Sequence, residues 1–222
     1  MPPTRKNLSK NLFKPLLDEN KEQFNKADGH EIEGSQGSPA KMQALHSSSA
    51  IAVNFFQYWQ EMGLVSEIAS ACGFCQRGSS PSERIVFEEK YEIKSKFITS
   101  PNIDVVIHNK ASAPYKLFAI ECKFSEAYGS WAHGGMKPAY LQDQDIWEGL
   151  IALHTLAKEI SPDDNRYKLL HAAQLIKHIL GLKANVGLKK FRLLYLWYDV
   201  LGKDGADHRA EVDDFTAIAI AD

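Results

Sequence analysis

Cysteine is scarce in this sequence of 222 residues, which contains only Cys72, Cys75 and Cys122. An odd and sparse set excludes the disulfide framework of small secreted domains and is typical of a reducing compartment. The N-terminal segment has no apolar core of signal-peptide length. The chain also lacks any run of about 18 consecutive apolar residues, the length that a membrane-spanning helix needs. We therefore expect a cytoplasmic protein without a membrane span.

Net charge is also small, at -2. This excludes a histone-like protein whose affinity for nucleic acid comes mostly from neutralising phosphates. The small net charge does not exclude nucleic acid as a partner. An enzyme that binds a phosphodiester through metal ions has acidic residues in its site and needs only local basic patches. The chain has two basic patches, within residues 5–14 and 189–192. Each is equally compatible with a solvated face.

Internal repeats are absent, which excludes a solenoid or propeller. The content of 44% hydrophobic and 24% charged residues is that of a globular protein. A chain of this length buries roughly 70% of its unfolded surface, so neither disulfides nor a structural metal are required. Residues 1–40 are polar and end in a Gly/Ser/Pro-rich stretch, which predicts an N-terminal arm and linker. We expect residues 41–222 to form a single domain.

The apolar patterns predict a series of helices and strands in that domain. A helix at 41–62 is indicated by Ser47, Ser48 and Ser49, which offer an N-cap oxygen before an apolar series. The elements expected after it, in chain order, are strands over 84–93, 102–109 and 116–124, helices over 145–160 and 166–182, and a strand over 191–200.

Two of these strands, joined by the turn-rich connector NKASAP, form a predicted hairpin. If Asn109 faces Lys116, an antiparallel ladder sets Asp104 directly across from Glu121, and the two-residue period places Lys123 on the same face. The opposite face is then uniformly apolar, so a slip by one residue would bury the charges against it. That apolar face consists of Ile103, Val105, Ile107, Phe118, Ile120, Cys122 and Phe124.

Two carboxylates and an ammonium group on a mostly apolar surface are costly to desolvate unless something compensates them. A divalent cation would do so. The carboxylates of Asp104 and Glu121, together with a main-chain carbonyl and waters, make the oxygen-rich site that Mg²⁺ prefers. Lys123 beside the metal could position or activate a water and stabilise the charge that develops on phosphorus. This combination indicates phosphodiester hydrolysis.

The same residues resemble a known family. Asp104, sixteen intervening residues and then Glu121-Cys122-Lys123 are similar to the motif of the PD-(D/E)XK nucleases, the restriction-endonuclease-like superfamily. The ExK triplet occurs four times in this chain, but only this one follows an apolar strand with an Asp on the strand before it. Pro101 departs from the pattern, because it stands three residues before Asp104.

The resemblance implies a fold and an activity. The fold is an α/β core with a central mixed β-sheet of about four strands, flanked by helices on both faces in the order αβββαβα. The activity is that of a nuclease dependent on Mg²⁺, with Mn²⁺ as a substitute, acting on nucleic acid and above all on DNA. Asp104, Glu121 and the main-chain carbonyl of Cys122 would be metal ligands, and Lys123 the catalytic lysine.

Members of the superfamily often add an acid from a preceding element and a glutamine from the following helix. The resemblance makes Glu89 our choice for the acid over Glu88, although strand parity does not decide between them and a solvated strand acid is an alternative. It makes Gln174 the glutamine, on a polar helix stripe that could line a cleft or face water. That stripe consists of Tyr167, His171, Gln174 and His178.

Other interpretations remain open at this stage. A nuclease-like fold without catalysis, serving as a nucleic-acid-binding or assembly module, would engage the charges of Asp104, Glu121 and Lys123 in an internal salt bridge. Cys72 and Cys75 have CxxC spacing, but no helix is predicted after them, so we interpret them as packing residues rather than a redox pair. Residues 128–135 form an aromatic tract that would stack on a base or serve as a plain connector. A homodimer would supply two sites for the two strands of a duplex, but no segment identifies its surface.

Overall fold

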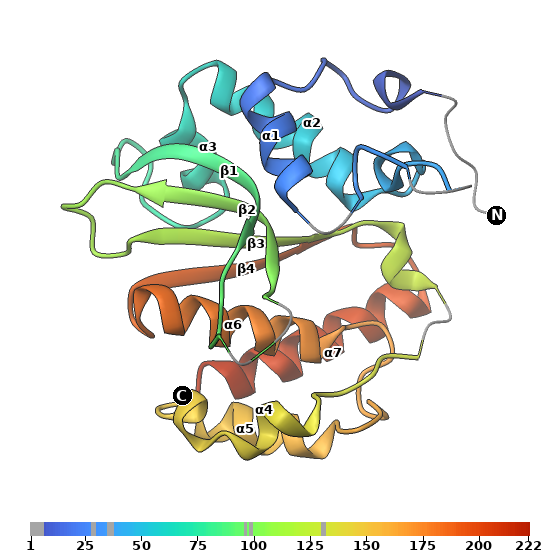
Figure 1. The fold of residues 1–222 in the computed structure, drawn as a ribbon, viewed down its shortest axis with the longest axis vertical. Helices are drawn as coiled ribbons and strands as arrows, with labels where there is room; N and C mark the ends of the chain where they lie inside the picture. Colours follow the sequence, from blue (N-terminus) through green and yellow to red (C-terminus); the bar gives the residue numbers. More distant parts are fainter. Residues whose placement is uncertain (1–6, 28–29, 35–37, 96, 98–99, 130–131) are drawn as a thin grey trace. The chain divides into compact units, whose positions relative to one another are not determined.

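The computed structural model describes residues 7–27, 30–34, 38–95, 97, 100–129 and 132–222, and shows an α/β fold with a four-stranded sheet (Figure 1). The helices are α1 (Asp18–Lys26), α2 (Ser48–Glu61), α3 (Val65–Ala71), α4 (Pro138–Gln142), α5 (Ile151–Glu159), α6 (Ala172–Val186) and α7 (Lys203–Ala219). The strands are β1 (Ser82–Lys90), β2 (Asn102–Asn109), β3 (Leu117–Lys123) and β4 (Phe191–Trp197). Short 3-10 helices are η1 (Leu8–Lys10), η2 (Lys41–Gln43), η3 (Ser125–Tyr128) and η4 (Gln144–Trp147).

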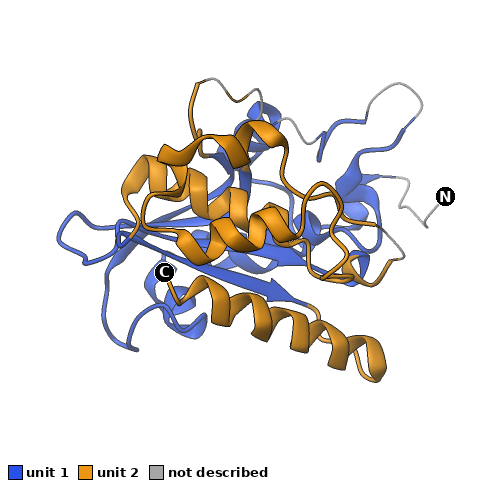
Figure 2. Cartoon of the chain, turned by 90° about the horizontal axis from the view of Figure 1, so that it is seen from below, with its two compact units in different colours: residues 1–90, 102–126, 189–197 blue, residues 91–101, 127–188, 198–222 orange. Residues whose placement is uncertain are grey.

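The chain divides into two compact units, drawn in different colours in Figure 2. Unit 1 comprises residues 1–90, 102–126 and 189–197, and it contains the whole sheet together with α1, α2 and α3. Unit 2 comprises residues 91–101, 127–188 and 198–222, and it contains α4 to α7.

The sheet of unit 1 has the strand order β1-β2-β3-β4. β1 and β2 pair antiparallel, as do β2 and β3, whereas β3 and β4 pair parallel, so the sheet is mixed. Strand β3 is interior to the sheet, and every residue from Leu117 to Cys122 is buried, which explains its nearly continuous apolar sequence. The mixed sheet, the flanking helices and the chain order confirm the predicted restriction-endonuclease-like core.

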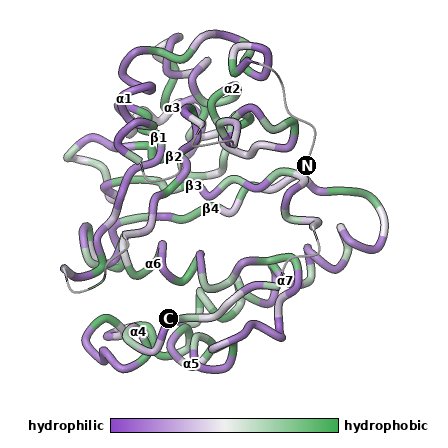
Figure 3. The backbone as a smooth tube through the Cα atoms, turned by 45° about the vertical axis from the view of Figure 1, so that its right-hand side comes forward, coloured by the Kyte–Doolittle hydropathy of each residue, from purple (hydrophilic) through white to green (hydrophobic). Residues whose placement is uncertain are grey.

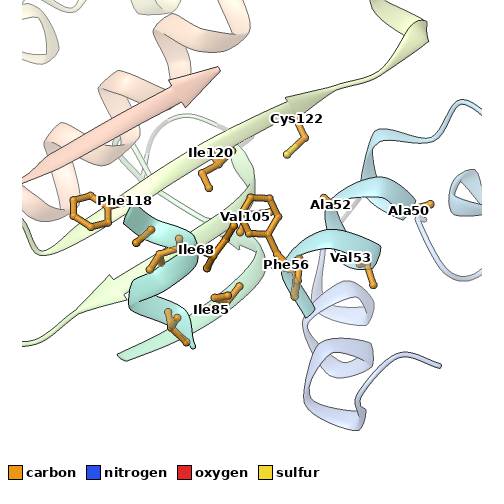
Figure 4. Packing of buried hydrophobic residues seen from close by; sticks show 14 of the residues in the cluster. Ala50, Ala52, Val53, Phe56, Ile68, Ile85, Val105, Phe118, Ile120 and Cys122 are labelled. Carbon is orange, nitrogen blue, oxygen red and sulfur yellow. The ribbon is translucent and has the colours of Figure 1, made fainter. Parts of the chain in front are cut away.

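Helix α2 packs its apolar face on the sheet of unit 1 (Figure 4). Phe56 of α2 has no exposed surface and lies in the same cluster as Val105, Ile120 and Cys122. Truncation of a buried Phe in such a core costs about 3–5 kcal/mol, so this contact holds the sheet face and α2 together.

The helix at the start of the predicted domain is shorter than the sequence indicated. Residues Lys41–Gln43 form a separate 3-10 turn, and α2 begins at Ser48. The hydroxyl oxygen of Ser47 accepts the N–H of Ala50 at 3.2 Å and so caps the helix. The three serines therefore mark the true helix start, as their capping chemistry predicts.

The polar segment before residue 41, predicted as an arm and linker, includes helix α1. Its Phe24 is buried and stacks on Phe87 of β1, with 5.8 Å between ring centroids. Gln23 accepts the main-chain N–H of Phe87 through its side-chain oxygen at 2.8 Å. This part of the N-terminal segment thus contributes to the core and to an edge of the sheet.

In unit 2, the predicted helix over 166–182 begins only at Ala172. The main-chain N–H groups of Lys168, Leu169 and Leu170 instead donate to the carboxylate of Glu211 on α7, at 2.8–2.9 Å. A side chain from another helix thus replaces the intrahelical acceptors, so helix propensity alone placed the start too early.

Hydrophobic and hydrophilic segments along the chain can be followed in Figure 3. Within the described residues, no helix has both the length and the apolar character needed to cross a membrane.

Candidate active site

The hairpin of β2 and β3 has the register that the sequence predicts. Its residue pairs run from His108 with Leu117 to Val105 with Ile120, and the N–H of Asn109 donates to the carbonyl of Lys116 at 2.9 Å. One step further along each strand, the same register sets Asp104 across from Glu121. The register predicted from the hydrophobic pattern is thus confirmed from Val105 to His108, and its continuation by one residue gives the predicted placement of the two acids.

Asp104 is attached to the neighbouring strand by its own carboxylate. Its Oδ2 accepts the main-chain N–H of Cys122 at 2.6 Å. Burial raises the pKa of Asp104 well above its usual range, and the carboxylates of Glu121 and Glu88 raise it further. Without a compensating cation, this carboxyl group therefore retains its proton well above the pH at which an exposed Asp ionises.

Glu121 and Lys123 form a close ion pair on the same strand. The distance between Lys123 Nζ and Glu121 Oε1 is 2.5 Å, and the Glu121 side chain is almost completely buried. Burial lowers the pKa of Lys123, but the carboxylates of Glu121 and Asp104 outweigh it and raise this pKa above its usual value. Lys123 is therefore an ammonium ion at neutral pH.

A third acid of the cluster is Glu88 on β1, not Glu89. Burial raises the pKa of Glu88 to about 8, with further contributions from Glu31 and Glu121. The backbone of Glu88 has a φ of 52°, a left-handed conformation, and the strand pairing continues in the same register on both sides of it. Glu89, our choice from the sequence, instead contacts His108, with 2.7 Å between Oε2 and Nε2.

Two residues before α2 extend the cluster, and sequence analysis missed both. Glu31 accepts the hydroxyl of Ser49 at 2.9 Å and pairs with Lys41 at 3.4 Å. Glu31 raises the pKa of Glu88, and Lys41 lowers it. Glu31 and Lys41 also line a cavity of about 410 Å³. No local sequence pattern predicts that Glu31 and Lys41 belong to the site, because tertiary contacts bring this polar segment to it.

Gln174 and the polar stripe predicted around it belong to unit 2 (Figure 2). Gln174 is half-buried on α6, and His178 is buried on the same helix. Tyr167 precedes the helix and donates its hydroxyl to Asp214 at 2.7 Å, so it does not share a helical stripe with them. The ring of His171 stacks on that of His133, with 4.7 Å between centroids.

The predicted metal site also includes the main-chain carbonyl of Cys122. Cys122 lies in β3 between Glu121 and Lys123, but nothing marks its carbonyl as a ligand. Among the described residues, no three His, Cys, Asp or Glu side chains are already arranged to hold a metal ion. A site of two carboxylates completed by a main-chain carbonyl and waters does not need a third such side chain.

The cysteines of the CxxC segment pack against the hydrophobic core of unit 1. Burial raises the pKa of Cys72 to about 11, which makes its thiol a poor nucleophile. In the aromatic tract after β3, Trp131 lies outside the described residues, while the hydroxyl of Tyr128 donates to the carbonyl of Tyr198 at 2.7 Å. Within the part of these two segments that the structure describes, Cys72 and Tyr128 are thus engaged in packing and in a main-chain hydrogen bond.

Comparison with known proteins adds one finding to this geometry. A family model described as Restriction Endonuclease associating with ARP matches residues 2–202. No curated protein and no solved structure matched the chain. The matched residues include the whole sheet and the acids and lysine of the β2–β3 hairpin. The chain therefore belongs to the family described as Restriction Endonuclease associating with ARP, within the restriction-endonuclease-like superfamily that its motif resembles.

Proposed function

We propose that this protein is a metal-dependent nuclease that hydrolyses phosphodiester bonds, with DNA as its substrate and Mg²⁺, or Mn²⁺ in its place, as its cofactor. One observation carries the proposal: the register of the hairpin, continued one residue beyond the pair of Val105 and Ile120, sets Asp104 across from Glu121, and Lys123 contacts Glu121. Membership of a restriction endonuclease family supports the same chemistry.

The charges of the cluster are suited to a hard divalent cation. Asp104, Glu88 and the groups that shift their pKa values comprise four carboxyl groups and two ammonium groups, which gives a surplus of two negative charges when all are ionised. These residues are Glu31, Glu88, Asp104, Glu121, Lys41 and Lys123. Burial is the main cause of the raised pKa values of Asp104 and Glu88, and the neighbouring carboxylates of this set raise them further. Asp104, Glu121 and the carbonyl of Cys122 would hold the ion, and Glu88 offers a further oxygen.

The residues of the chain divide the catalytic work between them. A bound Mg²⁺ would supply Lewis-acid stabilisation of the phosphate and lower the pKa of an attacking water. The hydrogen bond from the Cys122 N–H orients the Asp104 carboxylate. Lys123, held as an ammonium ion, stabilises the negative charge that develops on the phosphoryl oxygens. Its raised pKa favours this role over that of a general base.

A second candidate function is a nuclease-like module that binds or assembles without catalysis. The buried ion pair of Lys123 and Glu121 favours it, because such a pair can neutralise charge without a metal. Lys123 and Lys41 together still leave a surplus of two carboxyl groups in the cluster, however, which is why we prefer the metal-binding function.

Cleavage assays test the proposal directly. Supercoiled plasmid, labelled DNA oligonucleotides and labelled RNA of the same sequence would be incubated with the protein in Mg²⁺, Mn²⁺ or EDTA. We expect metal-dependent cleavage of DNA that Asp104→Asn abolishes and that Glu83→Gln, at an exposed acid on β1, leaves unchanged. Metal-dependent cleavage of RNA alone would exclude DNA as the substrate. No cleavage of any substrate by a protein that still binds DNA would favour the module.

A further inference from the structure

Helix α2 carries a row of large apolar side chains on its solvent side. Ile51 is 41% exposed, Phe55 48% and Tyr58 44%, and Met62, directly after the helix, is 55% exposed. On the opposite side of the same helix, Ala52, Val53 and Phe56 are buried in the hydrophobic core. The exposed row therefore cannot turn inward without taking Phe56 out of the core.

The surface around this row is nearly free of charge. Helix α2 contains a single charged residue, Glu61 at its last position, and Lys14 pairs with it. Phe13, which is 81% exposed, is held beside the row because its N–H donates to Asn54 of α2 at 2.6 Å. Isolated apolar residues are normal on a surface, but a contiguous patch with few charges marks an interaction site.

The size of the patch is that of a specific interface. Half-exposed aromatic and large aliphatic residues present about 100 Å² each, so the row with Phe13 and Leu45 presents roughly 600 Å². A standard interface buries about 800 Å² on each partner, which a polar rim around this patch would supply.

The spacing of the row is compatible with a twofold arrangement of two such helices. From Ile51 to Met62 the intervals are four, three and four residues, a pattern that reads the same in both directions. We propose that a second copy of this chain covers the face, with the two α2 helices antiparallel about a twofold axis between Phe55 and Tyr58. In this arrangement Phe55 faces Tyr58 of the second copy and Ile51 faces its Met62.

The lack of charge along the row favours a second copy of the chain over nucleic acid as the partner. An isologous interface places each patch against itself, so it must carry no surplus of one charge, and this row carries none. Nucleic acid would need cations along the row, where the helix has none. The inference is independent of the proposed nuclease activity.

Sedimentation equilibrium between about 1 and 100 µM tests the association, a range in which a dissociation constant of micromolar order is measurable. The wild type should sediment at twice the mass of one chain. Phe55→Glu should weaken dimerisation at least about 100-fold, because it places charge at the centre of the interface. Leu201→Glu, at a 98% exposed position in unit 2, is the matched control and should leave the dimer intact. Circular dichroism melting checks that each variant is folded.

A charge exchange tests the register. Phe55→Glu and Tyr58→Arg should each be monomeric alone, but a mixture of the two should form a heterodimer, because glutamate then faces arginine across the axis. A monomeric wild type at about 100 µM, or a Phe55→Glu variant that still dimerises, would overturn the proposal. Failure of the mixture to associate, with a dimeric wild type, would overturn the antiparallel arrangement.

Discussion

The carboxylate of Asp104 accepts the main-chain N–H of Cys122, with 2.6 Å between Oδ2 and the nitrogen. The main-chain pairing of β2 and β3 ends at Val105 and Ile120. The hydrogen bond of the Asp104 side chain is a further contact between the two strands, next to the last pair. It also fixes a motif acid relative to the strand that carries Glu121. The geometry of the two acids is thus set by the chain itself.

This contact makes Asp104→Asn an informative substitution. The amide keeps an oxygen that can accept the Cys122 N–H, but it removes a ligand charge. Cleavage should fall at least about 100-fold, the loss of roughly 3 kcal/mol of transition-state stabilisation. In EDTA the melting temperature should stay equal or rise, because repulsion from Glu121 and Glu88 disappears. Activity assays and calorimetry check the two outcomes.

Asp104→Ala is the comparison for stability. It removes the same charge but also the acceptor for the Cys122 N–H. Its melting temperature should therefore lie below that of Asp104→Asn. Equal melting of the two variants would show that the hydrogen bond contributes nothing and would contradict our account of the site geometry.

Hydrophobic patterning predicted the placement of Asp104, Glu121 and Lys123, because only one register buries an apolar face and leaves charges on the other. The same reasoning could not select Glu88 over Glu89. The sequence does not give the register of β1 against β2. In the structure Phe87 pairs with Val105 and Glu89 with Ile103, so Glu88 lies between these pairs, at the level of Asp104.

Two predicted helices differ from the structure, one because of a local backbone conformation and the other because of a tertiary contact. The predicted helix over 145–160 is interrupted because Gly149 has a φ of 74°, which allows the chain to leave the helix. The helix over 166–182 starts late because Glu211, far away in sequence, binds the main-chain N–H groups that precede it. The positions of Glu31 and Lys41 near Glu88 depend on the fold of the N-terminal segment, which no local pattern encodes.

Lys123 provides a prediction that separates charge from metal binding. Lys123→Met keeps an apolar stem but removes the ammonium group, so cleavage should fall at least about 100-fold. The stabilisation by Mn²⁺ in melting experiments should persist, because the carboxylates remain. The melting temperature in EDTA should fall, since the variant leaves the buried Glu121 carboxylate without the lysine. Lys90→Met, at an exposed residue on β1, is the control. Loss of Mn²⁺ stabilisation in Lys123→Met would contradict these roles.

Glu88 predicts how the stability of the metal-free protein depends on pH. Its pKa is 4.5 when unperturbed and about 8 in the folded chain, so the folded state holds a proton that the unfolded state has lost. This contribution to stability is complete below pH 4.5 and is lost as pH rises toward 8. Melting temperatures in EDTA should therefore decline less steeply with pH in Glu88→Gln than in the wild type.

Glu89→Gln is the matched control for that experiment. Glu89 contacts His108, whereas the carboxylates that raise the pKa of Asp104 are those of Glu121 and Glu88. Its variant should flatten the slope less than Glu88→Gln does, because it retains Glu88 with its pKa of about 8. If Glu89→Gln flattened the slope and Glu88→Gln did not, the original choice from the sequence would be correct and our assignment of the third acid would fail.

Metal binding should be linked to both stability and pH. A cation that binds the folded chain and hardly the unfolded one raises the free energy of unfolding by RT ln(1 + [L]/Kd), about 2.7 kcal/mol at one hundred times Kd. Mn²⁺ should therefore raise the melting temperature of the wild type more than that of Asp104→Asn. The effect should be larger at pH 8 than at pH 6, because Asp104 and Glu88 must release their protons before they bind a cation.

Calcium and the salt-bridge alternative complete this test. Ca²⁺ takes the same oxygen ligands and should stabilise the protein, but its looser coordination should support little cleavage. If Lys123 and Glu121 only neutralise each other, neither cation should shift the melting temperature at any pH. Equal melting of wild type and Asp104→Asn across millimolar Mn²⁺, without cleavage of plasmid or single strands, would show that these charges form a structural ion cluster.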